Sequence, residues 1–239
     1  LKGIALNYSA LPGRVALFNT ENLSLVSATD KGLNLINTPW GGGHQRVNEF
    51  NNKDSFLFTA AEGPVWADAS GAFKDYRPLK GYGNFSHLGF NGYFRSGNQV
   101  VLDYSVNGTR VLDAVSDHNH GLARYLEVAP HDKPLTVRLL DDSSEKGFAL
   151  KVKAIGGGVK TTSNDGTYFL RLDASAKRTK IALLYTGDSK AEAPAPVSLT
   201  PLTEGGPGIS PEVFEVEAKV DTSKKAWLVD QVPLPPALK

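Results

Sequence analysis

Cysteine and methionine are both absent from the 239 residues of the chain. Without cysteine the chain cannot form a disulfide, a thiolate zinc site, an iron–sulfur cluster or a C-x-x-C-H haem attachment, and it has no cysteine nucleophile. The lack of cysteine suits an oxidising compartment, although many cytosolic domains also lack disulfides. Because the first residue is Leu1 rather than Met, we expect a processed chain or a fragment of a longer one.

The chain also lacks an excess of charge of one sign and a long apolar run. Lys and Arg number 26 against 25 Asp and Glu, so no basic field exists to attract nucleic acid or an anionic membrane. No apolar stretch is long enough to cross a bilayer, and we expect no membrane insertion. A hydrophobic fraction of 41% and a charged fraction of 21% are typical of a globular protein.

What the sequence does contain is short alternating segments separated by Gly, Asn, Asp and Pro, which indicates antiparallel β structure. The clearest is QVVLDYSVNGTRVLDAV, residues 99–115, where the apolar side chains of the first half share one face. Its centre, Asn107-Gly108, is a strong signal for a hairpin because a type I′ turn needs two residues with positive φ. No helical stripe persists, so we predict an all-β fold: a large antiparallel β-sandwich with long aromatic-rich loops and little helix.

Three parts of the chain differ in character. Residues 1–185 hold most of the predicted strands and form the sandwich. Residues 186–211 are rich in Pro, Gly and Ala and predict a linker or surface arm. Residues 212–239 contain two further strands, 212–220 and 224–232, and a Pro-rich exit segment towards a following domain. Earlier strands are expected at 3–8, 14–19, 22–28, 33–37, 55–60, 92–97, 123–129, 134–140, 148–155, 167–173 and 179–185, with a tight turn at 164–166.

Catalytic patterns are weak. No G-x-S-x-G occurs, and neither GGG run, at 41–43 or 156–158, precedes a helix with a phosphate-binding Lys. His118 and His120 form an H-x-H pair that could hold zinc or copper on a strand, but we interpret it as a polar strand start. Paired acids occur, such as Asp68 with Asp75 and Asp113 with Asp117, but the sequence does not give the separation across a cleft that glycoside hydrolysis needs. Nothing distinguishes these acids from solvated turn residues, and we treat them as such. We therefore predict no catalytic residue, no metal and no cofactor, and expect that this segment alone is not an enzyme.

Aromatic side chains crowd into the loop-rich region between residues 40 and 90. They could form a stacking platform for sugars, or they could plug an open end of the sandwich, and we favour the plug. The candidate ligand-binding set, should the platform exist, is Trp40, His44, Trp66, Asp68, Tyr76 and Tyr82.

Three stretches together carry a family resemblance: FNTENLSLVSA (18–28), GPVWADASGAFKDYRPLKGYG (63–83) and LGFNGYFRSGNQVVLDYSVNGTRVLDA (88–114). They resemble a family of uncharacterised bacterial secreted proteins with a β-rich domain of unknown function. The shared positions in the second stretch are Gly63, Pro64, Trp66, Ala67, Asp68, Gly71, Phe73, Asp75, Arg77, Tyr82 and Gly83. Residues 91–97 depart from the family pattern, and residues 186–211 align poorly.

The resemblance implies a context rather than a chemistry. In such proteins this domain precedes a β-propeller similar to those of quinone-dependent sugar dehydrogenases, often with a c-type cytochrome module. It implies a periplasmic or extracellular multidomain redox protein, in which this segment is a non-catalytic structural or docking module. Its partner would be the propeller or cytochrome domain or chain. The alternative is a carbohydrate-binding or carbohydrate-processing sandwich.

Overall fold

The computed structural model describes residues 3–30, 55–58, 63–79, 83–119, 121–141, 149–204, 217 and 219–223. The chain divides into two compact units, Leu1–Thr203 and Glu204–Lys239. Every strand of the described residues belongs to the first unit. In the second unit the described residues are few, and the backbone N–H of Ser223 donates to Asp221 Oδ1 over 2.8 Å.

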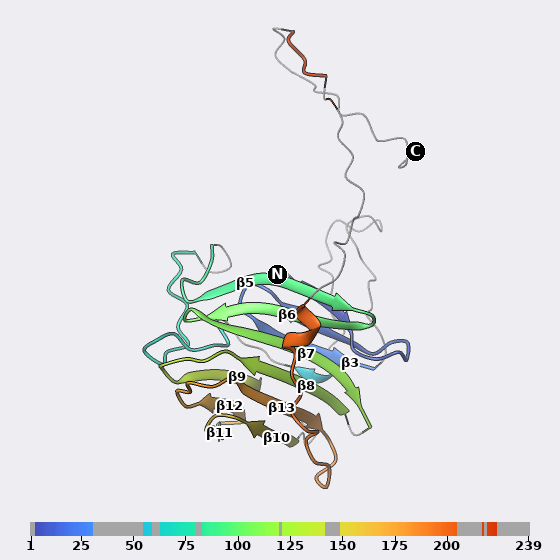
Figure 1. Cartoon of the computed structure of the whole chain (residues 1–239), viewed down its shortest axis with the longest axis vertical. Coiled ribbons are helices and arrows are strands. Elements are labelled where there is room, and N and C mark those ends of the chain that lie inside the picture. Colours follow the sequence, from blue (N-terminus) through green and yellow to red (C-terminus); the bar gives the residue numbers. More distant parts are fainter. Residues whose placement is uncertain are drawn as a thin grey trace. The chain divides into compact units, whose positions relative to one another are not determined.

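The first unit contains three antiparallel sheets (Figure 1). A four-stranded sheet has the order β1 (Gly3–Asn7), β2 (Val15–Asn19), β3 (Ser24–Thr29), β4 (Ser55–Phe58). A six-stranded sheet has the order β10 (Ala149–Ile155), β13 (Thr179–Thr186), β8 (Gly121–Val128), β7 (Thr109–His118), β6 (Gln99–Val106), β5 (Leu88–Ser96). A three-stranded sheet has the order β11 (Val159–Asn164), β12 (Thr167–Leu172), β9 (Leu135–Asp141). The prediction of an all-β fold with antiparallel sheets is confirmed.

One apolar core lies between the six-stranded sheet and the two smaller sheets. Alternate residues of the large sheet, such as Leu102, Leu126 and Leu183, join Phe18 of β2 and Val137 of β9 in a single buried cluster. The period of two places every second side chain on this inner face, which is why the apolar alternation in the sequence is so regular. The core is therefore that of a two-layer sandwich in which the second layer is assembled from two sheets.

The stretch GPVWA, residues 63–67, joins the two smaller sheets into one layer. The backbone N–H of Val65 donates to Asn22 O over 3.4 Å on the side of the four-stranded sheet. On the other side Ala67 N donates to Thr136 O over 2.9 Å and Arg138 N donates to Val65 O over 2.8 Å. The stretch thus behaves as an irregular strand that satisfies backbone groups of β9 and closes the seam between the sheets.

The β6–β7 hairpin forms as predicted, with Val106 opposite Thr109 and positive φ at Asn107 (50°) and Gly108 (79°). A second turn of the same kind joins β11 to β12, with φ of 48° at Asp165. Strand β11 itself is missing from the sequence prediction, because its segment VKTTSN has only one apolar residue and most of its side chains are exposed. Strand β5 is longer than the predicted 92–97, and the predicted strands 33–37 and 224–232 lie outside the described residues.

The outer face of the large sheet is covered by a segment that we call the strap, residues 187–203. It ends in the single-turn 3-10 helix η2 (Thr200–Thr203), which lies over the sheet in Figure 1. Leu199 of the strap is buried with Val101, Leu112 and Ala114 on this outer face. This explains why strands β6 to β8 carry apolar residues on both faces, as strands covered on both sides do.

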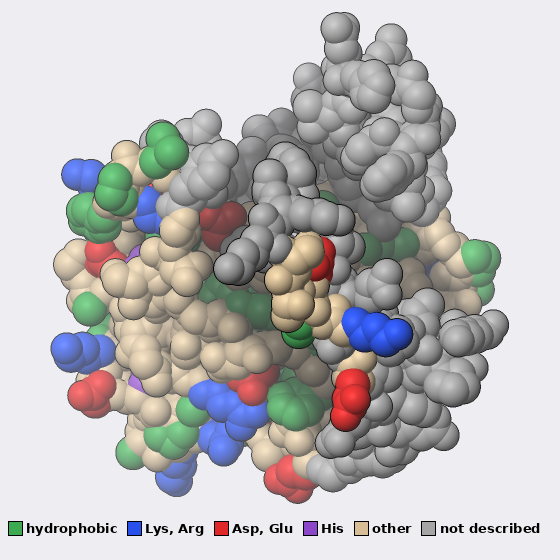
Figure 2. Space-filling view, turned by 90° about the horizontal axis from the view of Figure 1, so that it is seen from above, with side chains coloured by type: hydrophobic (Ala, Val, Ile, Leu, Met, Phe, Trp, Pro, Cys, Tyr) green, Lys and Arg blue, Asp and Glu red, His purple; other side chains and the backbone are tan. Residues whose placement is uncertain are grey.

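The surface carries no single-sign field on the face seen in Figure 2, where basic and acidic side chains lie scattered among each other. This agrees with the near-equal numbers of basic and acidic residues. Among the residues that the structure describes, no helix has the length and hydrophobicity needed to cross a bilayer.

Candidate binding cavity at one end of the sandwich

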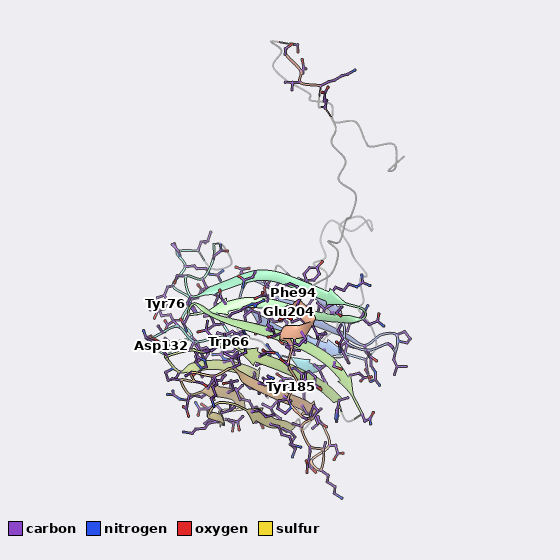
Figure 3. The ribbon with its side chains drawn as sticks, in the orientation of Figure 1. Trp66, Tyr76, Phe94, Asp132, Tyr185 and Glu204 are labelled. Carbon is purple, nitrogen blue, oxygen red and sulfur yellow. The ribbon has the colours of Figure 1, made fainter. Side chains whose placement is uncertain are left out.

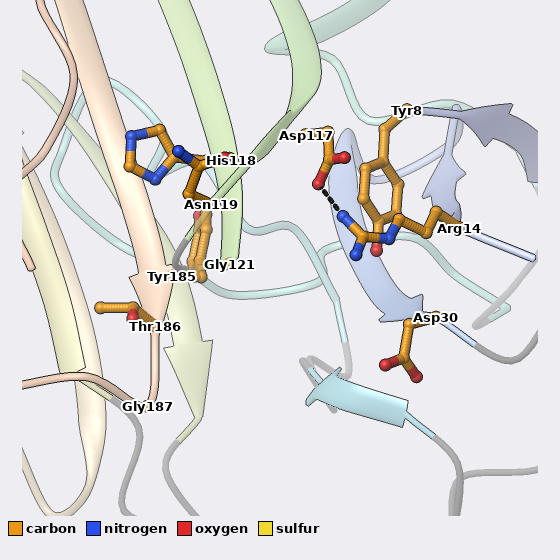
Figure 4. A pocket seen from close by; sticks show the side chains of 10 residues that line it. All are labelled: Tyr8, Arg14, Asp30, Asp117, His118, Asn119, Gly121, Tyr185, Thr186 and Gly187. Atoms are coloured by element: carbon orange, nitrogen blue, oxygen red, sulfur yellow. Dashed lines mark hydrogen bonds and ion pairs between the residues drawn. The ribbon is translucent and has the colours of Figure 1, made fainter. Parts of the chain in front are cut away.

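A cavity of about 300 Å³ lies at the end of the sandwich where β7 turns into β8 (Figure 4). One wall comes from the four-stranded sheet and its turns, with Tyr8, Arg14 and Asp30. The other wall comes from the end of β7, the start of β8 and the end of β13. The cavity thus opens between the two layers, where strand ends rather than strand faces supply the side chains.

An ion pair between Arg14 and Asp117 links the two walls. Asp117 also accepts a hydrogen bond from Ser9 Oγ over 2.8 Å, and its backbone N–H donates to Tyr8 O over 2.8 Å. The Arg14 and Asp117 side chains are 32% and 30% exposed, so solvent weakens their attraction. Asp117 nevertheless contacts Arg14, Ser9 and the Tyr8 backbone, and these three contacts together hold the two walls at a fixed separation.

Tyr8 and Asp30 give the same wall a neutral phenol and a carboxylate. The Tyr8 hydroxyl donates to Thr29 O over 3.2 Å, and burial raises the pKa of Tyr8 well above its ordinary value. The phenol is therefore neutral at physiological pH. Asp30 is exposed at the rim and has no hydrogen-bond or ion-pair partner among the described residues.

Gly121 allows the opposite wall to close. Its φ is +147°, and a Cβ at this position would overlap the backbone carbonyl of Tyr185. The start of β8 can therefore approach the end of β13 only with glycine here. Thr186 follows, and its Oγ1 accepts a hydrogen bond from Asp188 N over 2.9 Å.

Beneath the cavity the core holds a buried ion pair. Arg124 of β8 binds Asp113 of β7 through two nitrogens, Nε to Oδ1 at 3.0 Å and Nη2 to Oδ2 at 2.6 Å. Both side chains are only 2% exposed, and Tyr104 Oη donates to Asp113 Oδ2 over 3.0 Å. The treatment of Asp113 as a solvated turn residue is wrong, because it lies on the inner face of the sheet with its charge matched by Arg124.

The predicted ligand-binding set is not brought together by the described residues. The Trp66 ring is fully buried inside the sandwich, 6.3 Å from the Tyr104 ring, whereas Tyr76 is 63% exposed at the edge (Figure 3). Trp40, His44 and Tyr82 lie outside the described residues. In this conformation the Trp66 ring supports the core and offers no face to a sugar, while a ligand site at the other five residues stays a prediction.

The acids of the aromatic loop organise the loop itself. Asp68 Oδ1 accepts hydrogen bonds from Ser70 N (2.8 Å), Ser70 Oγ (2.6 Å) and Ala72 N (3.0 Å), and the Ser70 bond does most to lower the pKa of Asp68. These bonds close a turn, a common use of aspartate in loops.

Arg77 fastens the far part of the same loop. It binds Asp75 through Nε (2.9 Å) and Nη2 (2.7 Å), forms an ion pair with Glu21, and stacks 3.9 Å from the centre of the Phe85 ring. The hydrogen bond with Asp75 raises the pKa of Arg77, which therefore stays charged. The loop residues that match the family pattern thus hold the loop to the sandwich.

A metal site finds no geometric support in the described part of the chain, where no three or more His, Asp or Glu side chains are grouped to hold an ion. His118 lines the end cavity, and His120 lies outside the described residues.

Comparison with known proteins gives one match. A family model described as "Domain of unknown function (DUF6797)" matches residues 16–113. Residues 16–113 are therefore similar to this domain of unknown function. No curated protein and no solved structure shows significant similarity to the chain.

The DUF6797 match contains the loop of Trp66 and Arg77 but little of the end cavity. Among the described residues that line the cavity, Asp30 is the one that falls within 16–113. Sequence reasoning also missed the cavity, because Arg14 and Asp117 are separated by 103 residues and no short motif connects them. One signal was present in the sequence. Asp117 lies two positions after Val115, so the period of two places its carboxylate on the same inner face, at the end of β7.

Proposed function

We propose that this chain is a non-catalytic β-sandwich module that anchors the rest of a larger polypeptide. The observation that carries the proposal is the strap, which holds the end of the first unit to the large sheet by a buried carboxylate. A module that positions other domains needs a rigidly attached segment from which the chain continues, because neighbouring domains otherwise move relative to one another.

Glu127 of β8 is the residue that fastens the strap. Its Oε2 accepts hydrogen bonds from Leu199 N (2.6 Å), Thr200 N (3.0 Å) and Ser198 Oγ (3.0 Å), and its Oε1 accepts one from Thr200 Oγ1 (2.6 Å). The Glu127 side chain is fully buried. Burial alone would raise the pKa of Glu127, but the hydrogen bonds from the strap together lower it, so the carboxylate is ionised at neutral pH.

The charged residues of the aromatic loop support a non-catalytic role. Asp68 closes a turn, and Arg77 is held by Asp75 and Glu21. A general acid or base must come within hydrogen-bond reach of the proton that it transfers, whereas the hydrogen bonds and ion pairs of Asp68 and Arg77 described above go to residues of the protein. A platform for carbohydrate built on Trp66, the alternative function, gains no support from a ring that is fully buried.

The resemblance to secreted multidomain proteins supplies the context of the proposal. In that context the module is periplasmic or extracellular, and the partner that it positions is a quinone-dehydrogenase-like β-propeller or a c-type cytochrome. The chain itself would carry no electrons.

Hydrogen exchange of the whole chain tests the anchoring, with Glu127→Gln compared with the parent and with Asp132→Asn as a control on another surface. We expect slow exchange at Leu199 and Thr200 in the parent and the control. In Glu127→Gln exchange should be about tenfold faster or more, because bonds to a charged acceptor are lost. Free exchange at these amides in the parent would refute the anchoring, and reduction of a quinone-analogue dye by the purified chain would refute the non-catalytic role.

A further inference from the structure

We propose that the end cavity binds a neutral polyhydroxylated ligand, with the size and chemistry of one sugar residue. The first residue of the strap, Gly187, lines the cavity, but the proposal does not depend on Glu127 or on the anchoring function. It also differs from a platform on the aromatic loop, because its residues are Arg14, Asp30, Asp117, Asn119 and Thr186.

The charges of the cavity disfavour an anionic ligand and give a cation little advantage. Among the described residues of the lining, Arg14 carries a permanent positive charge, and its ion pair with Asp117 already neutralises that charge. A second carboxylate, Asp30, lies on the same side of the cavity (Figure 4). An anion would meet this carboxylate without a spare cation to hold it. A cation would meet one carboxylate at the exposed rim, where solvent weakens the attraction. We therefore expect hydrogen bonds rather than charge pairing to hold the ligand.

The hydrogen-bonding groups require a ligand that both donates and accepts. The carboxylates of Asp30 and Asp117 only accept, the guanidinium of Arg14 only donates, and the Asn119 amide and the Thr186 hydroxyl can do both. Figure 4 shows Asp30 and the ion pair on one side, with Asn119 and Thr186 on the other. Hydroxyl groups spaced around a small ring satisfy such a mixed set, whereas an apolar ligand would leave these groups without partners.

The size of the cavity fits a small ligand. A volume of about 300 Å³ is at the lower end of the range for small-molecule sites. Tyr8 adds an aromatic surface, and the tie of Asp117 to Ser9 and to the Tyr8 backbone holds the walls in place. A preformed site of this kind avoids the entropic cost of ordering loops around the ligand.

The other two cavities lack these properties. One of about 300 Å³ lies under the strap, where Leu199 and Leu202 line it beside Gln99 and Ser116, and its described lining has no charged side chain. The other is a shallow depression near His131 and Asp132, at the opposite ends of β7 and β8. Of these three, the end cavity is the one whose described lining combines an ion pair with a further carboxylate, an amide and a hydroxyl group.

Titration calorimetry of the whole chain tests the proposal with glucose, galactose, mannose, xylose and N-acetylglucosamine, each raised to millimolar concentration. Glucuronate and glucosamine serve as charged comparators of the same size. Asp30→Ala and Asn119→Ala remove single exposed side chains that have no partner among the described residues, so both variants should unfold at the parent temperature. Asp132→Ala removes the same carboxylate at the opposite end of the sandwich and is the matched control.

We expect at least one neutral sugar to bind more tightly than either charged comparator. Each cavity variant should weaken that binding about fivefold or more, the effect of losing one good hydrogen bond, while Asp132→Ala leaves it unchanged. Three results would overturn the proposal: no binding of any neutral sugar by the parent, tighter binding of glucuronate or glucosamine, or equal affinity in the parent and in both cavity variants.

Discussion

Replacing Arg124 by Leu should destabilise the sandwich far more than the same change at Arg110. Both arginines bind an aspartate through two nitrogens in nearly the same geometry. Arg124 lies 3.0 and 2.6 Å from Asp113, and Arg110 lies 3.1 and 2.7 Å from Asp103. The pairs belong to the same sheet but to opposite faces, so they differ chiefly in burial.

Burial sets the expected magnitudes. The Arg124 and Asp113 side chains are 2% exposed, whereas the Arg110 side chain is 41% exposed. Removing one partner of a buried pair leaves a charge without compensation and costs about 3–5 kcal/mol. The Asp103 side chain is 11% exposed, but Arg110 is open to solvent, and a pair with one partner in solvent is expected to contribute about 1 kcal/mol. In a unit of this size Arg124→Leu should therefore lower the Tm by about 6–20 °C, against a few degrees for Arg110→Leu.

Urea denaturation followed by far-UV circular dichroism measures both free energies of unfolding. Combining Asp113→Leu with Arg124→Leu and Tyr104→Phe removes both charges and the hydroxyl that donates to Asp113. This triple variant should recover most of the stability lost in Arg124→Leu, because an apolar replacement of a buried pair is often neutral. Equal costs for the two single variants, or a triple variant weaker than Arg124→Leu, would refute the view that desolvation dominates at this pair.

Three further changes test other parts of the sandwich. Trp66→Ala should cost about 3–5 kcal/mol in urea denaturation, since the ring is fully buried and leaves a large cavity, and a loss below 1 kcal/mol would contradict that burial. Gly121→Ala should lower the Tm clearly, because its Cβ overlaps the Tyr185 carbonyl, while Gly187→Ala, where a Cβ meets no atom within 4 Å, should not. Because the pKa of Glu127 is lowered by folding, its stabilisation is complete above the unfolded value of about 4.3 and is lost as the pH falls. The Tm difference between the parent and Glu127→Gln should thus be constant at pH 6–8 and shrink below about pH 4, and a difference that grows on acidification would reverse this sign.

The sequence predicted the strands whose side chains alternate and failed where burial depends on distant segments. The apolar face of residues 100–106 and the Asn107-Gly108 turn are local properties, so the β6–β7 hairpin could be read directly. Strand β11 pairs with β12 through its backbone and exposes its side chains, which leaves no hydrophobic period to detect. Its position is fixed by the neighbouring strand rather than by its own residues.

The sequence prediction missed the buried ion pair because charged side chains usually lie on the surface. Asp113 stands between Val111 and Val115, and Arg124 stands between Leu122 and Leu126, so each charge interrupts an inner apolar stripe. Opposite charges interrupting the apolar stripes of two consecutive strands are a detectable signal for a buried pair. A similar signal pointed to the strap, because β6 to β8 are apolar on both faces and therefore need a covering segment. The composition of residues 186–211 predicted only a linker or surface arm there.

The matched DUF6797 segment cannot bury its own apolar face. It ends at residue 113, inside β7, whereas β7 pairs along its length with β8, and β8 pairs with β13. Without these strands the inner face loses Leu126 and Leu183, and the Trp66 stretch loses its bonds to β9. The aromatic loop, whose residues define the resemblance, is therefore stable only because later strands complete the layer into which Trp66 packs. It follows that the segment that can fold as a unit is the whole sandwich to Thr203, and not the matched residues alone.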